Sequence, residues 1–270
     1  MNTDIQWVTE IRTNFNRAKN IFGVIAVCFI LFQVASSCNN EETEPTIVFA
    51  DVNLLTALCK QGADSNGDGS ISQSEAKNVT KITLIGENIT SFGGLEAFNR
   101  LDSMVLKMLP SERLNLSHIP QISYLECTLC EIRKLDLSGN RNLVTVLCEK
   151  NRLDTLLLPV SPVLKTLNCG YNRLRSIDVS GNPGITSLRC NNNLLTSLNL
   201  SSNPLLTQMI SCGNQLTSLD VSKNSSLTLL GVDNMPMLLV VYVWVLPFPP
   251  AGVNVLMTYS NQLRFAIANN

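Results

Sequence analysis

Apolar and polar positions repeat along this chain with a constant period. Successive units are 21 residues apart and begin at Leu101, Ile122, Leu143, Leu164, Ile185, Leu206 and Leu227. An earlier unit, residues 79–100, is one residue longer. The clearest copy, residues 164–184, has the skeleton L-x-x-L-x-C-x-x-N-x-L-x-x-L-x-V-S-x-N. A short fixed period is typical of a solenoid, in which each repeat forms one coil of a stack.

Each unit contains two short segments in which apolar and polar residues alternate. In the clearest copy these are Leu167/Cys169 and Ile177/Val179. Alternation places the apolar side chains of each segment on one face of an extended chain. One coil cannot bury that face alone, but stacked coils share a continuous core. The pattern therefore predicts a mostly β solenoid of about eight coils over residues 79–238, each too short to carry a helix on its return path.

Asparagine recurs at two positions of the unit, both of which follow an alternating segment. One column is Asn151, Asn172, Asn193 and Asn214, and the other is Asn140, Asn182, Asn203 and Asn224. The chain turns at these points and leaves backbone groups unpaired. A side-chain amide is expected to satisfy them.

The segment before the repeats has a different pattern. A helix is expected over residues 50–59, with Asp51 as N-cap and Leu54, Leu55 and Leu58 on one face. Residues 64–75 read DSNGDGSISQSE and satisfy the EF-hand calcium-loop pattern. The candidate ligands of a calcium ion are Asp64, Asn66, Asp68, Ser70 through its carbonyl, and Glu75. The alternative is a loop held by hydrogen bonds alone.

Together these features resemble a known group of proteins. The repeat is similar to the bacterial leucine-rich repeat. With the EF-hand-like segment before it, the chain looks like the leucine-rich-repeat surface lipoproteins of Gram-negative gut bacteria, relatives of the internalin-like families. The resemblance covers residues 47–250. It implies a leucine-rich-repeat solenoid with a small helical EF-hand-like N-terminal cap, residues 47–78. Residues 239–270 are expected to form a β C-terminal cap.

Residues 1–37 have the pattern of a lipoprotein signal peptide. Basic residues precede the apolar run 21–34, which is shorter than the roughly 20 residues that span a bilayer. Small residues directly before Cys38 resemble a bacterial lipobox, which implies cleavage before Cys38 and membrane attachment through a lipid on it. An uncleaved membrane anchor is the alternative. Residues 38–46 are expected to form an acidic tether, similar to tracts that direct some lipoproteins to the outer face of the outer membrane.

Composition narrows the function. The 270 residues include 41 Leu and 30 Asn, with a net charge of −1 and 6% aromatic residues. This balance excludes a strongly basic nucleic-acid binder. One histidine, His118, argues against multi-histidine metal sites and against Ser–His or Cys–His catalysis. We expect no enzymatic activity.

Nine cysteines are present. The column Cys127, Cys148, Cys169 and Cys190 is predicted to point inward and to pack as small, reduced apolar residues. Cys130 forms a C-x-x-C motif with Cys127 but falls in an asparagine column. Partners for a redox or zinc site are missing from the sequence.

Residues beside the inward positions must point outward and form a candidate binding face. The strongest candidates for ligand contact are Tyr124, Glu126, Asn168, Tyr171 and Arg189. The expected function is a surface interaction module whose partner is a protein or a cell-surface glycan. The alternatives are a structural envelope protein, or a non-catalytic glycan-binding subunit of a polysaccharide-processing complex.

Overall fold

The computed structural model describes residues 44–110, 112–257 and 263–268. The chain divides into two compact units, residues 1–45 and 46–270. The described residues of the first unit are Glu44 and Pro45, so the predicted signal peptide and Cys38 lie outside the described part of the chain. None of the helices within that part is long and apolar enough to cross a membrane.

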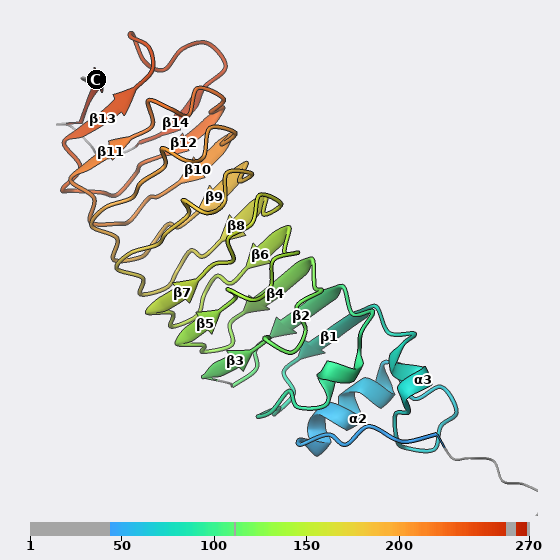
Figure 1. Ribbon diagram of the computed structural model, residues 1–270. Helices are drawn as coiled ribbons and strands as arrows, with labels where there is room; N and C mark the ends of the chain where they lie inside the picture. The colour runs from blue at the N-terminus through green and yellow to red at the C-terminus, as the bar shows by residue number, and fades with distance from the viewer. Residues whose placement is uncertain (1–43, 111, 258–262, 269–270) are drawn as a thin grey trace, which may run out of the picture. The chain divides into compact units, whose positions relative to one another are not determined.

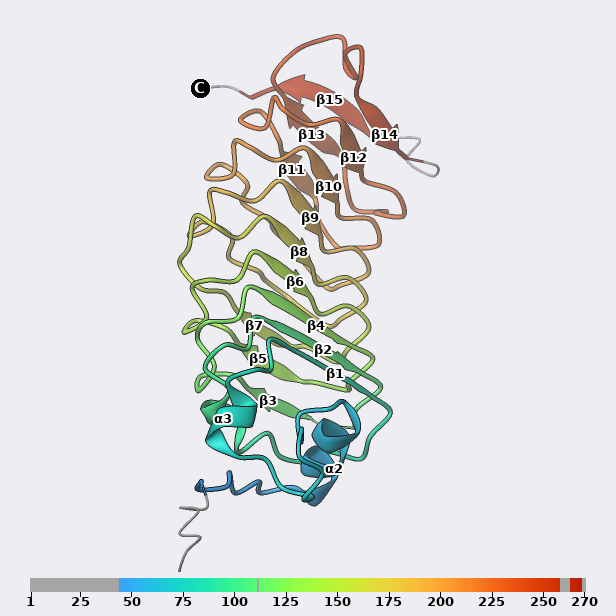
Figure 2. The ribbon, with the colours of Figure 1, turned by 90° about the vertical axis from the view of Figure 1, so that its right-hand side faces the viewer.

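The second unit is a leucine-rich-repeat solenoid (Figures 1 and 2). Within the described residues, nine parallel strands stack into one main sheet, one strand from each coil. Their order is β1 (Lys81–Ile85), β2 (Ser103–Lys107), β4 (Tyr124–Thr128), β6 (Thr145–Leu147), β8 (Thr166–Asn168), β9 (Ser187–Arg189), β10 (Gln208–Ile210), β12 (Leu229–Gly231) and β14 (Asn254–Leu256). From β2 to β12, paired residues are 21 apart, so the sequence period becomes the register of the sheet.

The second alternating segment of each unit forms shorter sheets on another side of the coils. Three strands, β3 (Arg113–Asn115), β5 (Lys134–Asp136) and β7 (Thr155–Leu157), make one side sheet. Another contains β11 (Ser218–Asp220), β13 (Val240–Val243) and β15 (Arg264–Ile267). Between them, the predicted segments 177–179 and 198–200 are not strands. Val179, Leu198 and Leu200 are nevertheless buried, and Ile177 is partly buried against the core.

The core is formed by the predicted inward columns. Leu125, Val146, Leu167 and Leu188 are fully buried, as are Cys127, Cys148, Cys169 and Cys190. The burial of all four cysteines confirms the predicted inward packing, and all four are free thiols. Burial raises the pKa of each thiol, and that of Cys169 to about 12. These thiols therefore stay protonated and unreactive at neutral pH.

The asparagine columns bond to the backbone of adjacent coils. Nδ2 of Asn193 donates to the carbonyls of Cys169 and Cys190, both at 3.0 Å, and its Oδ1 accepts from Leu174 N at 3.0 Å. Asn203 in the second column donates to two carbonyls, but its buried Oδ1 lacks a partner. Cys130 replaces an asparagine, and its Sγ donates to Leu106 O at 3.4 Å.

The N-terminal part of this unit contains its helices. Helix α2 (Val52–Lys60) begins after Asp51, whose Oδ1 accepts from Asn53 N at 2.8 Å. Oδ2 of the same carboxylate accepts from Thr90 N and Thr90 Oγ1, so it also ties the helix to the first coil. Helix α3 (Gln73–Ala76) has four residues and a capping box made by Ser72 and Glu75. A 3-10 helix, η1 (Leu95–Ala97), precedes β2.

The segment 239–270, predicted to be a β cap, extends the main sheet and the side sheet that contains β11. Strand β13 pairs with β11, β14 pairs with β12, and β15 pairs with β13. Within the described residues, the main sheet thus has eight strands in residues 79–238, as predicted, and a ninth, β14, from the cap segment. Aromatic rings pack at this end, with Phe248 lying 5.3 Å from Trp244 and 4.8 Å from Phe265 between ring centroids.

Candidate functional site: the outer face of the main sheet and the 64–75 loop

The predicted binding residues lie on the outer face of the main sheet or directly beside it. Tyr124 and Glu126 come from β4, whereas Asn168 and Arg189 lie side by side on β8 and β9. Tyr171 lies three residues beyond Asn168, past the end of its strand. Strand β6 separates the two groups. At about 4.8 Å per coil, β4 and β8 lie about 10 Å apart, so the face carries two clusters rather than one constellation.

The first cluster is an ion pair at the N-terminal end of the face. Lys107 Nζ lies 2.7 Å from Glu126 Oε1, and Tyr124 donates its hydroxyl proton to Glu126 Oε2 at 3.3 Å. The hydrogen bond to Glu126 raises the pKa of Lys107, whereas burial is the main cause of the raised pKa of Tyr124. The cluster borders a shallow hollow of about 390 Å³ over β1, β2 and β4. Sequence reasoning missed Lys107. It lies two residues beyond Val105, which is the register partner of Glu126 on the adjacent coil.

The second cluster surrounds β8. Asn168 Nδ2 donates to Glu149 Oε2 at 2.7 Å, which orders both side chains on adjacent coils. Lys150 Nζ lies 6.0 Å from the centre of the Tyr171 ring, within the range of a cation–π contact. Arg189 is exposed. No carboxylate among the described residues lies within ion-pair distance of its guanidinium.

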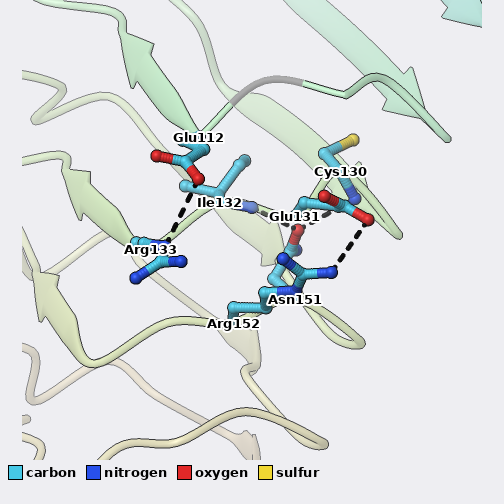
Figure 3. A network of polar contacts seen from close by, with 7 residues as sticks. All are labelled: Glu112, Cys130, Glu131, Ile132, Arg133, Asn151 and Arg152. Carbon is cyan, nitrogen blue, oxygen red and sulfur yellow. Dashed lines mark hydrogen bonds and ion pairs between the residues drawn. The ribbon is translucent and has the colours of Figure 1, made fainter.

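A larger hollow of about 770 Å³ lies over β3 and β5, away from the predicted face. Charged side chains of both signs border it, including Glu112 and Arg133, which form an ion pair at 3.5 Å. Figure 3 shows this pair and a second pair, between Glu131 and Arg152 at 3.1 Å. It also shows Asn151, whose Oδ1 accepts from the backbone N–H groups of Cys130 and Ile132. Both ion pairs join adjacent coils and are solvent-exposed, so each contributes little to stability.

The 64–75 loop folds its polar side chains onto its own backbone. Asp64 accepts from Gly67 N and Gly69 N at 2.7 and 2.9 Å, and Asp68 accepts from Ser70 N at 2.8 Å. The buried Glu75 carboxylate accepts from Ser72 N and Ser65 N, both at 2.8 Å. The backbone hydrogen bond from Ser72, followed by the bonds from Ser65, lowers the pKa of Glu75 to about 2.

The donor set of this loop suits a hard cation such as calcium, because every candidate ligand atom is an oxygen. Negative charge is concentrated in this loop. Burial is the largest cause of the raised pKa of the Cys59 thiol, and the charges of Asp64, Glu75 and Asp68 raise that pKa further. In the conformation described, however, no group of three or more His, Cys, Asp or Glu side chains is gathered to hold a metal ion, in any described part of the chain.

Comparisons with known proteins identify the fold. No family model and no curated protein matches the sequence. Internalin C2 from Listeria monocytogenes str. 4b F2365 is similar in structure, with a TM-score of 0.65 and 17% sequence identity over 80% of this chain and 98% of its own. The functional domain of InlJ from Listeria monocytogenes, described as including a cysteine ladder, has a TM-score of 0.49 and 20% identity over 74% of this chain. This chain covers 58% of that domain's chain.

Proposed function

We propose that the protein is a lipid-anchored, surface-exposed interaction module that binds a protein partner through the outer face of its main sheet. The observation that carries this proposal is the contrast between two sets of columns. The inward columns repeat Leu, Val and Cys and are fully buried. The outward positions change from coil to coil, as in Glu126, Leu147, Asn168 and Arg189, which align in register.

The stacked coils support such a role because they present side chains on a preformed surface. A partner then binds without ordering that surface first, which reduces the entropic cost of association. Tyr124 and Arg189 are the side chains best suited to anchor a partner, because Tyr and Arg dominate the energetics of most interfaces.

The test is capture of partners from host and microbial extracts by the immobilised full chain, followed by affinity measurements on the recovered protein. Tyr124→Ala and Arg189→Ala should each weaken binding without lowering the free energy of unfolding. Normal binding by both variants would refute the assignment of this face. Recognition of glycans on an array, with no protein captured, would favour the glycan-binding alternative.

Membrane attachment through Cys38 is a separate part of the proposal, supported by the lipobox-like sequence before it. We expect wild-type protein to incorporate labelled fatty acid and to fractionate with the outer membrane. Cys38→Ser should lose both properties. Digestion of intact cells with added protease tests surface exposure. A Cys38→Ser variant that fractionates like the wild type would contradict lipid anchoring.

Calcium binding by the 64–75 loop is the last part, supported by the agreement of its sequence with the EF-hand pattern and by its oxygen donors. The loop is expected to bind calcium with a Kd on the order of 0.1–1 mM, typical of extracellular modules. A hundredfold excess of calcium over Kd would then stabilise the folded chain by about 2.7 kcal/mol. Equal thermal unfolding in chelator and in millimolar calcium would leave a loop held by hydrogen bonds alone.

A further inference from the structure

One column of the solenoid carries bulky residues in a backbone conformation that disfavours them. In eight successive coils, one residue shortly after the main strand has a positive φ. These residues share one column: Gly86, Met108, Leu129, Lys150, Tyr171, Asn192, Gly213 and Asn234. Glycine and asparagine adopt this left-handed conformation most readily. Four consecutive coils nevertheless carry Met, Leu, Lys and Tyr there, with φ between 54° and 58°.

These four side chains, Met108, Leu129, Lys150 and Tyr171, form what we call the rim strip. Met108, Leu129 and Tyr171 are 54%, 50% and 51% exposed, and Lys150 is exposed as well. Because the coils stack about 4.8 Å apart, the strip is about 14 Å long. Exposed apolar side chains in consecutive coils, at positions where the backbone favours Gly or Asn, are typical of a binding surface rather than of a solvated edge.

Charge differs between the two ends of the rim strip. At the Met108 end, the nearby cation Lys107 is neutralised by Glu126 at 2.7 Å. At the Tyr171 end, Lys150 and Arg173 are exposed. No carboxylate among the described residues forms an ion pair with either of them. The strip is therefore apolar at one end and carries unpaired positive charge at the other.

We propose that the rim strip binds a protein segment in which apolar side chains are followed by acidic ones. The apolar part packs on Met108 and Leu129, and the acidic part lies against Lys150 and Arg173. This inference rests on the proposed interaction function and names the chemistry of the partner. A membrane surface fits less well, because the strip is one residue wide.

The experiment measures binding of short fluorescent synthetic peptides to the full chain in nonionic detergent, by anisotropy. One peptide carries Leu followed by Glu residues, a second has Lys in place of Glu, and a third has Ser in place of Leu. We expect the first peptide to bind more tightly than the other two, and its affinity to fall with added salt because part of the attraction is electrostatic.

Leu129→Asn and Lys150→Asn test the strip itself. Asparagine already occupies the same column at Asn192 and Asn234, so both variants keep a compatible backbone. Each should raise the Kd of the Leu–Glu peptide by about tenfold, or about 1.4 kcal/mol. The matched control is Leu157→Asn on β7, whose side chain is 49% exposed on the side sheet. It should leave the Kd unchanged.

Three results would overturn the inference: equal binding of all three peptides or of none, unchanged Kd in both strip variants, or strip-dependent binding of anionic phosphatidylglycerol vesicles in place of the peptide. If captured partners depend on Tyr124 and Arg189 while peptide binding ignores the strip, the inference fails and the proposed function stands. If peptide binding depends on the strip while partners ignore Tyr124 and Arg189, the sheet-face assignment fails instead.

Discussion

Replacing Asn172 by alanine tests the physical basis of the solenoid. The buried side chain donates from Nδ2 to the carbonyls of Cys148 and Cys169, both at 3.0 Å, and accepts from Leu153 N at 3.0 Å. Alanine removes these bonds and a fourth, from Asn172 Nδ2 to Gly170 O at 3.1 Å. A buried backbone group left without a partner costs about 1–3 kcal/mol. Cys148 O keeps a donor in Asn151 Nδ2, and Cys169 O keeps one in Asn193 Nδ2. One unpaired group, Leu153 N, therefore remains, and it lowers the free energy of unfolding by about 1–3 kcal/mol.

Two other asparagines provide graded controls. Asn203 donates to the carbonyls of Val179 and Asn182, but Val179 O also accepts from Asn182 N at 3.0 Å. Asn182 O likewise accepts from Ile185 N at 3.2 Å, so Asn203→Ala leaves neither carbonyl unpaired and should cost about 0.5–1 kcal/mol. Asn168 is half-exposed, so water replaces its bonds, and Asn168→Ala should cost about 0.5 kcal/mol or less.

The assay is urea unfolding of the full chain, followed by circular dichroism, with hydrogen exchange to locate the loss of protection. The expected order of destabilisation is Asn172, then Asn203, then Asn168. Exchange should increase in the coil of Asn172 and in the preceding coil, because its bonds join these two. If Asn172→Ala costs no more than Asn168→Ala, the ladder is not what holds adjacent coils together.

Other expected outcomes concern strain, charge and the thiols. Leu129→Asn should raise the free energy of unfolding by about 1 kcal/mol in urea titrations, because it relieves a left-handed leucine. Hydrogen bonds led by that from Thr90 N lower the pKa of Asp51 from 3.8 to about 2. Its contribution to stability is therefore complete above pH 4 and is lost as the pH falls toward 2, a dependence that Asp51→Asn should remove. Iodoacetamide at pH 8 should label Cys169 only once the chain is unfolded, and no reductant should be needed, because the thiol is buried and free. Mass-spectrometric detection of a disulfide at Cys169 would contradict this. Glu112→Gln should change the unfolding free energy by less than about 0.5 kcal/mol, since the pair it breaks is exposed.

The strained column shows where sequence reasoning stopped short. The sequence contains a signal for it, because Gly86, Asn192, Gly213 and Asn234 share the position and favour positive φ. Met108 and Leu129 hide that signal, since neither residue type indicates a left-handed backbone. The same is true of the C-terminal segment, whose strands continue both sheets although its sequence no longer follows the repeat.

The sequence by itself determined the coil, its period and its inward columns. Those features follow from alternation within a few residues and from the need of each coil to bury one apolar face against the next. It also determined the role of the asparagines, because an amide at a turn bonds to whatever backbone lies beside it. Only the tertiary structure decided which outward side chains meet, as in Lys107 with Glu126 and Lys150 with Tyr171. Such contacts depend on the side-chain direction that each turn imposes, and no local pattern specifies how two long polar side chains on different coils will point.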